Sequence, residues 1–173
     1  MKIVVVGTRG IPDIQGGVET HCEELYPRLA AMGHDVTVVR RSCYVTPQNK
    51  IKEYKGVHLK DIYAPRRKSI EAIVHTFLAI IYARWVGADV LHIHAIGPAL
   101  LTPLARLLGL RVVMTHHGPD YDRQKWNKTA KSVLRWGERM GTNYANEVIV
   151  ISTVIDNILR EKYDRTDAHL FYN

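Results

Sequence analysis

Short apolar runs alternate along the chain with longer segments whose apolar residues recur at helical spacing. The first run, Lys2–Val6, is continuous and β-branched, which is typical of a strand buried on both faces of a parallel sheet. A pair of irregular strands is expected on either side of a turn at Lys55 and Gly56. Further strands are predicted over 34–39, 88–94, 110–118 and 146–152.

The segments between these strands have the period of amphipathic helices. The first places its apolar residues on one face: Val18, Cys22, Leu25, Leu29 and Met32. Gly33 marks its end, and Pro27 is expected to remove a hydrogen bond and kink it. Ser69 is the predicted N-cap of the second helix. The remaining helices are predicted over 69–86, 98–108, 128–145 and 153–162.

Alternation of strands and helices predicts the fold class: α/β, a Rossmann-like parallel sheet with helices on both faces. Ligands of such sheets bind beyond the carboxyl ends of the strands. The residues that follow the predicted strands are therefore the first place to look for a site. They lie at 8–17, 40–43, 94–97, 116–122 and 152.

Composition narrows the function classes only a little. The 173 residues carry a formal net charge of +7, which suits nucleic acid, an anionic membrane, an acidic small molecule or a merely basic surface. No nucleic-acid recognition motif is present, so nucleic acid is not expected as a partner. Cys22 and Cys43 lack metal or disulfide spacing, and no stretch reaches the roughly 20 apolar residues of a membrane span. We expect a cytoplasmic protein.

The stretch "GTRGIPDIQGGVETH", Gly7–His21, joins the first strand to the first helix. Bare backbone beside a helix N-terminus predicts a phosphate site, although a simple connecting turn is the alternative. The spacing is neither that of a dinucleotide-binding turn nor that of a P-loop. Arg40 and Arg41 end the second strand where an NADP-binding enzyme could hold a 2′-phosphate, so an NADP-dependent reductase stays open.

At this point the sequence resembles the N-terminal domain of family-4-type glycosyltransferases with the GT-B fold, nearest to bacterial rhamnosyltransferase-like enzymes of surface polysaccharide synthesis. The resemblance rests on "VVVGTRGIPDIQGGVETHCEELYPRLAAMGHDVTVV", "DVLHIHAIGPAL", "VVMTHHGPDYDRQKW" and "EVIVIS". It implies retaining transfer of a sugar from a nucleotide-sugar donor to a glycan or lipid-linked glycan acceptor.

The resemblance also implies a division of labour between two domains. Residues 1–173 correspond to the acceptor-side domain, and "HLFYN" at 169–173 resembles the start of the connector to a C-terminal nucleotide-sugar domain. That second domain is the expected partner, and the isolated domain is expected to be inactive. A non-catalytic module that binds a phosphorylated sugar or anionic lipid is the remaining alternative.

Candidate site residues lie in the loops after the strands. Gly16 and Gly17 are expected to point backbone N–H groups at donor phosphate or sugar, with Thr8 and Arg9 in the same loop. Glu19, in the first helical turn, is expected either to cap the helix or to contact acceptor.

The residues after the later strands supply the rest of the predicted site. The resemblance implies that His117 contacts the transferring sugar. His116 is expected to point the other way, and His94 to line the cleft. Asp120 is a candidate contact for acceptor hydroxyls, whereas Asp122 is expected to be solvated.

The histidines offer a candidate metal site. His92 and His94 share a strand face and could meet His116 or His117 around a metal, but no cysteine or supporting acid is predictable nearby, so neither a metal nor a cofactor is expected.

Basic residues also gather before and within two of the helices. Arg66, Arg67 and Lys68 precede a helix whose apolar stripe is expected to pack on the sheet: Ile70, Ile73, Val74, Phe77, Ile80 and Ile81. This basic rim could make weak peripheral contact with an anionic membrane. A second basic set is expected to form a solvated face: Lys125, Lys128, Lys131, Arg135 and Arg139.

Overall fold

One eight-stranded sheet runs through the middle of the computed structural model, which describes residues 1–173. Its strands, in spatial order, are β3 (Glu53–Tyr54), β4 (Val57–Ile62), β2 (Asp35–Arg41), β1 (Lys2–Val6), β5 (Val90–His94), β6 (Val112–His116), β7 (Glu147–Val150) and β8 (His169–Leu170). Every neighbouring pair is parallel except the β3–β4 hairpin, which turns at the predicted Lys55-Gly56. The predicted fold class is confirmed.

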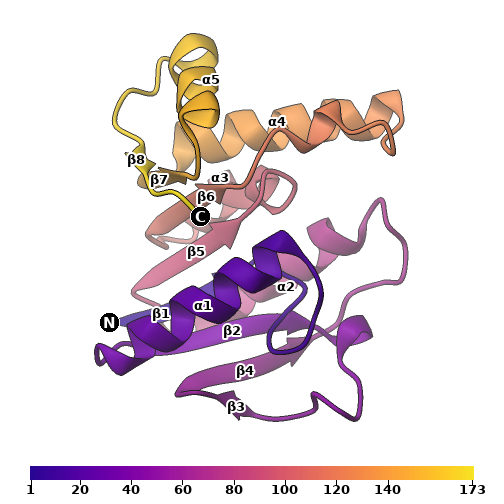
Figure 1. Cartoon of the computed structure of the whole chain (residues 1–173), viewed down its shortest axis with the longest axis vertical. Coiled ribbons are helices and arrows are strands. Elements are labelled where there is room, and N and C mark those ends of the chain that lie inside the picture. The colour runs from indigo at the N-terminus through magenta and orange to yellow at the C-terminus, as the bar shows by residue number, and fades with distance from the viewer.

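Five α-helices connect these strands, as Figure 1 shows: α1 (Gly17–Ala31), α2 (Glu71–Trp85), α3 (Thr102–Leu107), α4 (Lys128–Tyr144) and α5 (Thr153–Tyr163). Short 3-10 turns occur at η1 (Ser42–Tyr44), η2 (Pro98–Leu101) and η3 (Asp120–Asp122). The helix predicted over 98–108 is therefore divided into η2 and α3. None of the helices combines the length and the apolar character that a membrane crossing requires.

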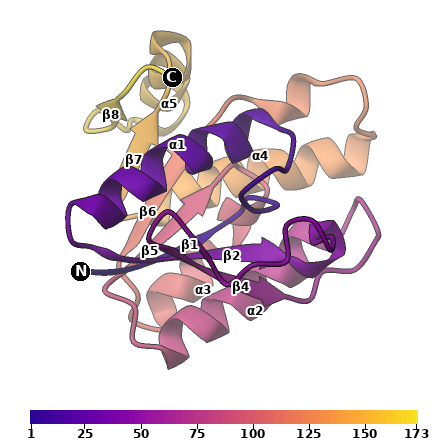
Figure 2. The same ribbon diagram turned by 60° about the horizontal axis from the view of Figure 1, so that its bottom comes forward.

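Alternate residues of β1 explain why both faces of the sheet are covered. Ile3 and Val5 belong to a core cluster that includes residues of α1, whereas Val4 and Val6 belong to a larger one that includes residues of α2 and α5. Figure 2 shows α1 and α2 on opposite sides of the central strands. A strand buried on both faces needs an unbroken apolar sequence, which is what "KIVVV" supplies.

Two predictions about α2 are wrong. Its N-cap is Ile70, without a side-chain hydrogen bond, so Ser69 does not cap it. Its buried face keeps Ile80 of the predicted apolar stripe but is otherwise small and polar: Glu71, His75, Thr76, Ala79 and Ala83. The reason is local, since the sheet offers buried arginine and carbonyl groups at this position that need polar partners.

Four apolar side chains instead lie on the outer face of this segment: Ile70, Phe77, Ile81 and Trp85. The last three are spaced by four residues, which places them on one face of α2. Trp85 is 81% exposed. The helix therefore presents an apolar stripe to the surroundings of the domain.

Candidate active site

The parallel strands bring their carboxyl ends to one edge of the sheet, where the predicted site loops meet. Gly7, directly after β1, shows how close these segments approach. A Cβ at Gly7 would lie 2.2 Å from the carbonyl oxygen of His94, and its φ of +96° is unfavourable for other residues. Glycine is required here for packing between β1 and β5.

The N-terminus of α1 lies at the same edge. The helix begins at Gly17, with Gly16 as an N-cap that makes no side-chain hydrogen bond. The first intrahelical bond runs from the N–H of Thr20 to Gly16, which leaves the N–H groups of Gly17, Val18 and Glu19 without a partner in the domain. Three free donors at the positive end of a fifteen-residue helix are the arrangement that favours a bound anion.

The carboxylate of Glu19 shapes the loop instead of facing a ligand. It accepts hydrogen bonds from the hydroxyl of Thr8, at 3.1 Å, and from the backbone N–H of Arg9, at 2.8 Å. Glu19 and Thr8 are both buried. In this structure the loop uses the polar groups of both side chains to fold back onto the helix, and their contact with substrate stays a prediction.

Arg9 and Asp120 remain accessible. The Arg9 side chain is exposed and stacks on the ring of Tyr44, with 5.3 Å between the guanidinium carbon and the ring centre. Asp120 is partly exposed and forms an ion pair of 3.1 Å with Arg123. Both can still meet a ligand at this edge.

A row of hydrogen-bonded side chains crosses the site from β6 to the loop that follows it. Thr115 bonds Nε2 of His92 at 2.7 Å, and the hydroxyl of Tyr26 lies between Nδ1 of His92, at 2.8 Å, and Nε2 of His94, at 2.5 Å. Nδ1 of His94 is then 2.8 Å from Nε2 of His117. The predicted neighbours His94 and His117 are thus brought together, with Tyr26 of α1 and Thr115 as members that the sequence did not indicate.

Burial keeps the histidines of this row neutral. Burial first, and the charges of neighbouring imidazoles second, lower the pKa of His92 and of His117 to about 3. The same causes hold the pKa of His94 well below its ordinary value. At neutral pH each imidazole therefore has one N–H donor and one acceptor nitrogen.

Hydrogen-bond accounting then sets the direction of the row. The hydroxyl of Thr115 is fully buried, and its one partner is His92, so its O–H donates to Nε2. It follows that Nδ1–H of His92 donates to Tyr26, whose O–H donates to Nε2 of His94. Nδ1–H of His94 donates to Nε2 of His117. The last proton lies on Nδ1 of His117, which has no partner in the domain and is free to donate to a ligand.

His116 points to the other side of β6, as predicted. Its Nε2 contacts Glu138 of α4 and its Nδ1 accepts from the N–H of Gly118, so it belongs to a different network. His92 has both nitrogens engaged. The grouping weighed for a metal from sequence is therefore not the one that the fold assembles.

His21 is a further site residue that the sequence did not indicate. Its ring lies edge-on to His117, with 5.1 Å between the ring centres, and 5.6 Å from the ring of His94. One signal was available: His21 follows Gly17 by four residues and therefore shares a helix face with the N-terminal donors.

Arg40 and Arg41 are not available to a cofactor. Arg40 is fully buried and forms an ion pair of 2.6 Å with Asp61. It also donates a hydrogen bond of 2.7 Å to the backbone carbonyl of Asn49. Arg41 is buried against Glu71, at 2.8 Å. The prediction that they could hold a 2′-phosphate is wrong, because the sheet already uses both guanidinium groups.

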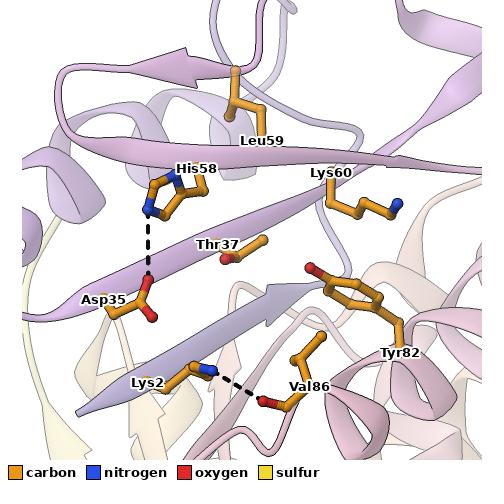
Figure 3. A pocket seen from close by; sticks show the side chains of 8 residues that line it. All are labelled: Lys2, Asp35, Thr37, His58, Leu59, Lys60, Tyr82 and Val86. Carbon is orange, nitrogen blue, oxygen red and sulfur yellow. Dashed lines mark hydrogen bonds and ion pairs between the residues drawn. The ribbon is translucent and has the colours of Figure 1, made fainter.

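A surface hollow also lies away from this edge of the sheet. It measures about 290 Å³ and is lined by residues at the amino ends of β1, β2 and β4, with Tyr82 of α2 and Val86 directly after that helix (Figure 3). His58 lies 3.7 Å from Asp35 across it. Its position at the amino ends of the strands, opposite to the edge where ligands of such sheets bind, separates it from the site.

Comparison with known families identifies the chain. The sequence model described as Glycosyltransferase Family 4 matches residues 15–173. The chain belongs to Glycosyltransferase Family 4. The enzyme class predicted by resemblance, a glycosyltransferase, is thereby supported at the level of the family. Comparison with curated proteins finds no matching sequence.

Solved structures give the same fold for this family-4 domain. Sucrose-phosphate synthase from Thermosynechococcus elongatus superposes with a TM-score of 0.73 at 17% identity, over 99% of this chain and 47% of the other. Anabaena HepE in complex with UDP and glucose superposes with a TM-score of 0.63 at 12% identity, over 99% of this chain and 44% of the other. UGT89C1 from Arabidopsis thaliana complexed with UDP-L-rhamnose superposes with a TM-score of 0.54 at 13% identity, over 99% of this chain and 51% of the other. The chain thus spans about half the length of these structures, and at such identities the similarity shows the fold alone.

Proposed function

We propose that the chain is the acceptor-side domain of a retaining glycosyltransferase, which moves a sugar from a nucleotide-sugar to a glycan or lipid-linked glycan. Membership of Glycosyltransferase Family 4 supports the reaction class. The observation that carries the proposal is the meeting of two kinds of free donor at one edge: the N-terminal N–H groups of α1 and Nδ1–H of His117.

These donors suit the charges of sugar transfer. Breaking the anomeric C–O bond leaves negative charge on a diphosphate and positive character on the sugar. The N–H groups of Gly17, Val18 and Glu19 can stabilise the phosphate charge without a metal. A neutral His117 can donate to a sugar hydroxyl without adding a positive charge beside the developing oxocarbenium ion.

A second domain completes the proposed enzyme. The chain spans about half of the GT-B structures that it matches, and their remaining half corresponds to the nucleotide-sugar domain implied by the resemblance. Residues 1–173 contain a complete sheet, so they should fold alone but transfer sugar at a negligible rate.

The decisive experiment measures sugar transfer by residues 1–173 and by the full-length enzyme. The donors are a panel of nucleotide-sugars that includes nucleotide-linked rhamnose and nucleotide-linked glucose. Transfer by the full-length enzyme alone supports the proposal, and rhamnose as the preferred sugar supports the rhamnosyltransferase-like assignment. Robust turnover by residues 1–173 contradicts the two-domain division. Sugar-phosphate binding by both forms without transfer indicates a non-catalytic module instead.

The outer face of α2 supports weak, reversible docking of this domain on an anionic membrane, close to a lipid-linked acceptor. Arg66, Arg67 and Lys68 are all exposed directly before the apolar stripe of Ile70, Phe77, Ile81 and Trp85. A basic rim beside exposed aromatic and aliphatic side chains is the arrangement of interfacial helices. Lys68 also lines a cleft of about 230 Å³ between α2 and α4, and the α4 segment carries the second basic set.

A further inference from the structure

Three imidazoles from three different elements converge at the candidate site. His21 comes from α1, His94 from the end of β5 and His117 from the loop after β6. One ring nitrogen of each lies within 4.8 Å of one nitrogen of each of the others. We propose that His21, His94 and His117 bind a divalent transition metal of the Zn²⁺ class, contrary to the expectation from sequence that no metal binds.

Each ligand has a nitrogen to offer. Oδ1 of Asn173 accepts a hydrogen bond of 2.5 Å from Nδ1 of His21, which leaves Nε2 of that ring as a lone pair. The other two ligand atoms are Nδ1 of His94 and Nε2 of His117, which share one proton in the metal-free hydrogen bond of 2.8 Å. Metal binding needs both lone pairs, so this proton must leave Nδ1 of His94 for the other nitrogen of the same ring.

Metal binding requires the three rings to shift, because their ligand nitrogens lie up to 4.8 Å apart without the metal. Zinc binds imidazole nitrogen at about 2.0–2.1 Å, so tetrahedral ligand nitrogens lie about 3.3 Å apart. The nitrogens of His94 and His117 must therefore separate by about half an ångström. His21 and His117 are only partly buried, which leaves room for their rings to adjust. Three histidines leave a fourth position for water or a sugar hydroxyl.

The buried row behind His94 provides the support that metal-bound histidines ordinarily have. When Nδ1 of His94 binds the metal, its proton moves to Nε2 and is donated to the oxygen of Tyr26. The hydroxyl of Tyr26 then donates to Nδ1 of His92, whose Nε2–H donates to Thr115. The row thus reverses direction and keeps each hydrogen bond between its members, at the cost of the buried O–H of Thr115, which then has no acceptor in the row. Nδ1–H of His117 stays free in both states, but a bound divalent cation brings positive charge to this ring. The metal-bound domain is therefore not the state in which His117 is proposed to serve sugar transfer, and metal binding is tested without any transfer assay.

The test uses residues 1–173, stripped of metal with a chelator that is then removed. Zinc chloride is added in a calorimetric titration, and cobalt chloride is followed by the visible absorption of four-coordinate Co²⁺. We expect one metal per chain, with a rise in the thermal unfolding midpoint. His21→Ala should weaken zinc binding at least tenfold and abolish the cobalt band. It should leave the unfolding midpoint in chelator nearly unchanged, because His21 lies at the surface of α1.

Two more variants separate this site from surface binding. Tyr26→Phe should weaken zinc binding about tenfold, the usual effect of losing a supporting hydrogen bond, while the three ligands stay in place. His58→Ala is the matched control, because His58 lies between Asp35 and Glu53 at the opposite end of the strands, and should bind zinc like wild type. Absence of zinc binding by the wild-type chain overturns the proposal, as does equal affinity in His21→Ala.

Discussion

Nε2 of His116 donates a hydrogen bond of 2.7 Å to Oε1 of Glu138, and both side chains are fully buried. The other nitrogen of His116 accepts from the N–H of Gly118 at 3.1 Å. The chain on both sides of His117 is therefore held by a carboxylate from α4. Burial alone would raise the pKa of Glu138, but hydrogen bonds, first from His116 and then from Tyr163, outweigh it and hold the pKa below its usual range.

Glu138→Gln tests this support. The amide keeps the shape but can no longer accept from His116, Tyr121 and Tyr163 at once. We expect the free energy of unfolding to fall by about 1–3 kcal/mol, the usual cost of an unpaired buried polar group, and kcat of the full-length enzyme to fall with it. Urea unfolding and steady-state kinetics measure both. The exposed Glu161→Gln is the control, and equal stability of the two variants would contradict the role of Glu138.

Gly17→Val tests ligand approach to α1. A Cβ at Gly17 meets no atom within 4 Å, so the fold has room for a side chain there and only a ligand would be blocked. Activity of the full-length enzyme should fall at least tenfold, about 1.4 kcal/mol in the barrier, with an unchanged unfolding midpoint. Gly16→Ala is the contrasting variant. It should destabilise the domain, because φ at Gly16 is +152° and its Cβ would overlap the carboxylate of Glu19. Wild-type kinetics in Gly17→Val would mean that the loop only connects β1 to α1 and does not bind a ligand.

His117→Ala should lower kcat more than it weakens nucleotide binding. His117 is proposed to face the transferring sugar, whereas the nucleotide belongs to the second domain. Steady-state kinetics give kcat, and calorimetry with the free nucleotide gives the affinity. His58→Ala, at the opposite end of the strands, should leave both unchanged. A loss of nucleotide affinity as large as the loss of kcat would assign His117 to the nucleotide.

The sequence predicted the parts of the fold that depend on local pattern, and missed those that depend on which elements become neighbours. Lys2–Val6 was recognisable as a buried strand because both faces of the sheet demand apolar residues. His21 was missed because its proximity to His117 depends on how α1 lies across the ends of β5 and β6. The outward stripe of α2 was missed because periodicity identifies a face without saying which face is buried. The hydrogen bond between Nε2 of His75 and the backbone carbonyl of Arg40 turns the face that contains His75 toward the sheet.

The buried histidines should make stability fall in mild acid. Burial is the main cause that lowers the pKa of His75 to about 4, and of His92 and His117 to about 3, from 6.5. Below pH 6.5 the unfolded chain therefore binds protons that the folded chain does not. The free energy of unfolding should be lost as the pH falls from about 6.5 toward 4, by up to about 1.4 kcal/mol per pH unit for each such histidine. Urea unfolding at pH 7.5, 6 and 5, in chelator, measures it. A flat profile would mean that these imidazoles titrate normally in the folded chain.

Replacing Arg66, Arg67 and Lys68 together with Ser tests the proposed membrane contact. Each basic group near an anionic surface contributes about 1 kcal/mol, which fades within a Debye length, so binding should be weak and reversed by salt. We expect residues 1–173 to sediment with anionic vesicles and hardly with neutral ones. The triple variant should lose this binding and keep its thermal unfolding midpoint, because all three side chains are exposed.

Trp85→Ser should weaken binding through the apolar stripe alone, since Trp85 is 81% exposed and carries no charge. Undiminished sedimentation of the triple variant would move the contact to α4, where Arg135 and Arg139 are also exposed. If the wild type ignores anionic vesicles but retards a nucleic acid at the same salt, the basic rim serves a different partner and the membrane proposal fails.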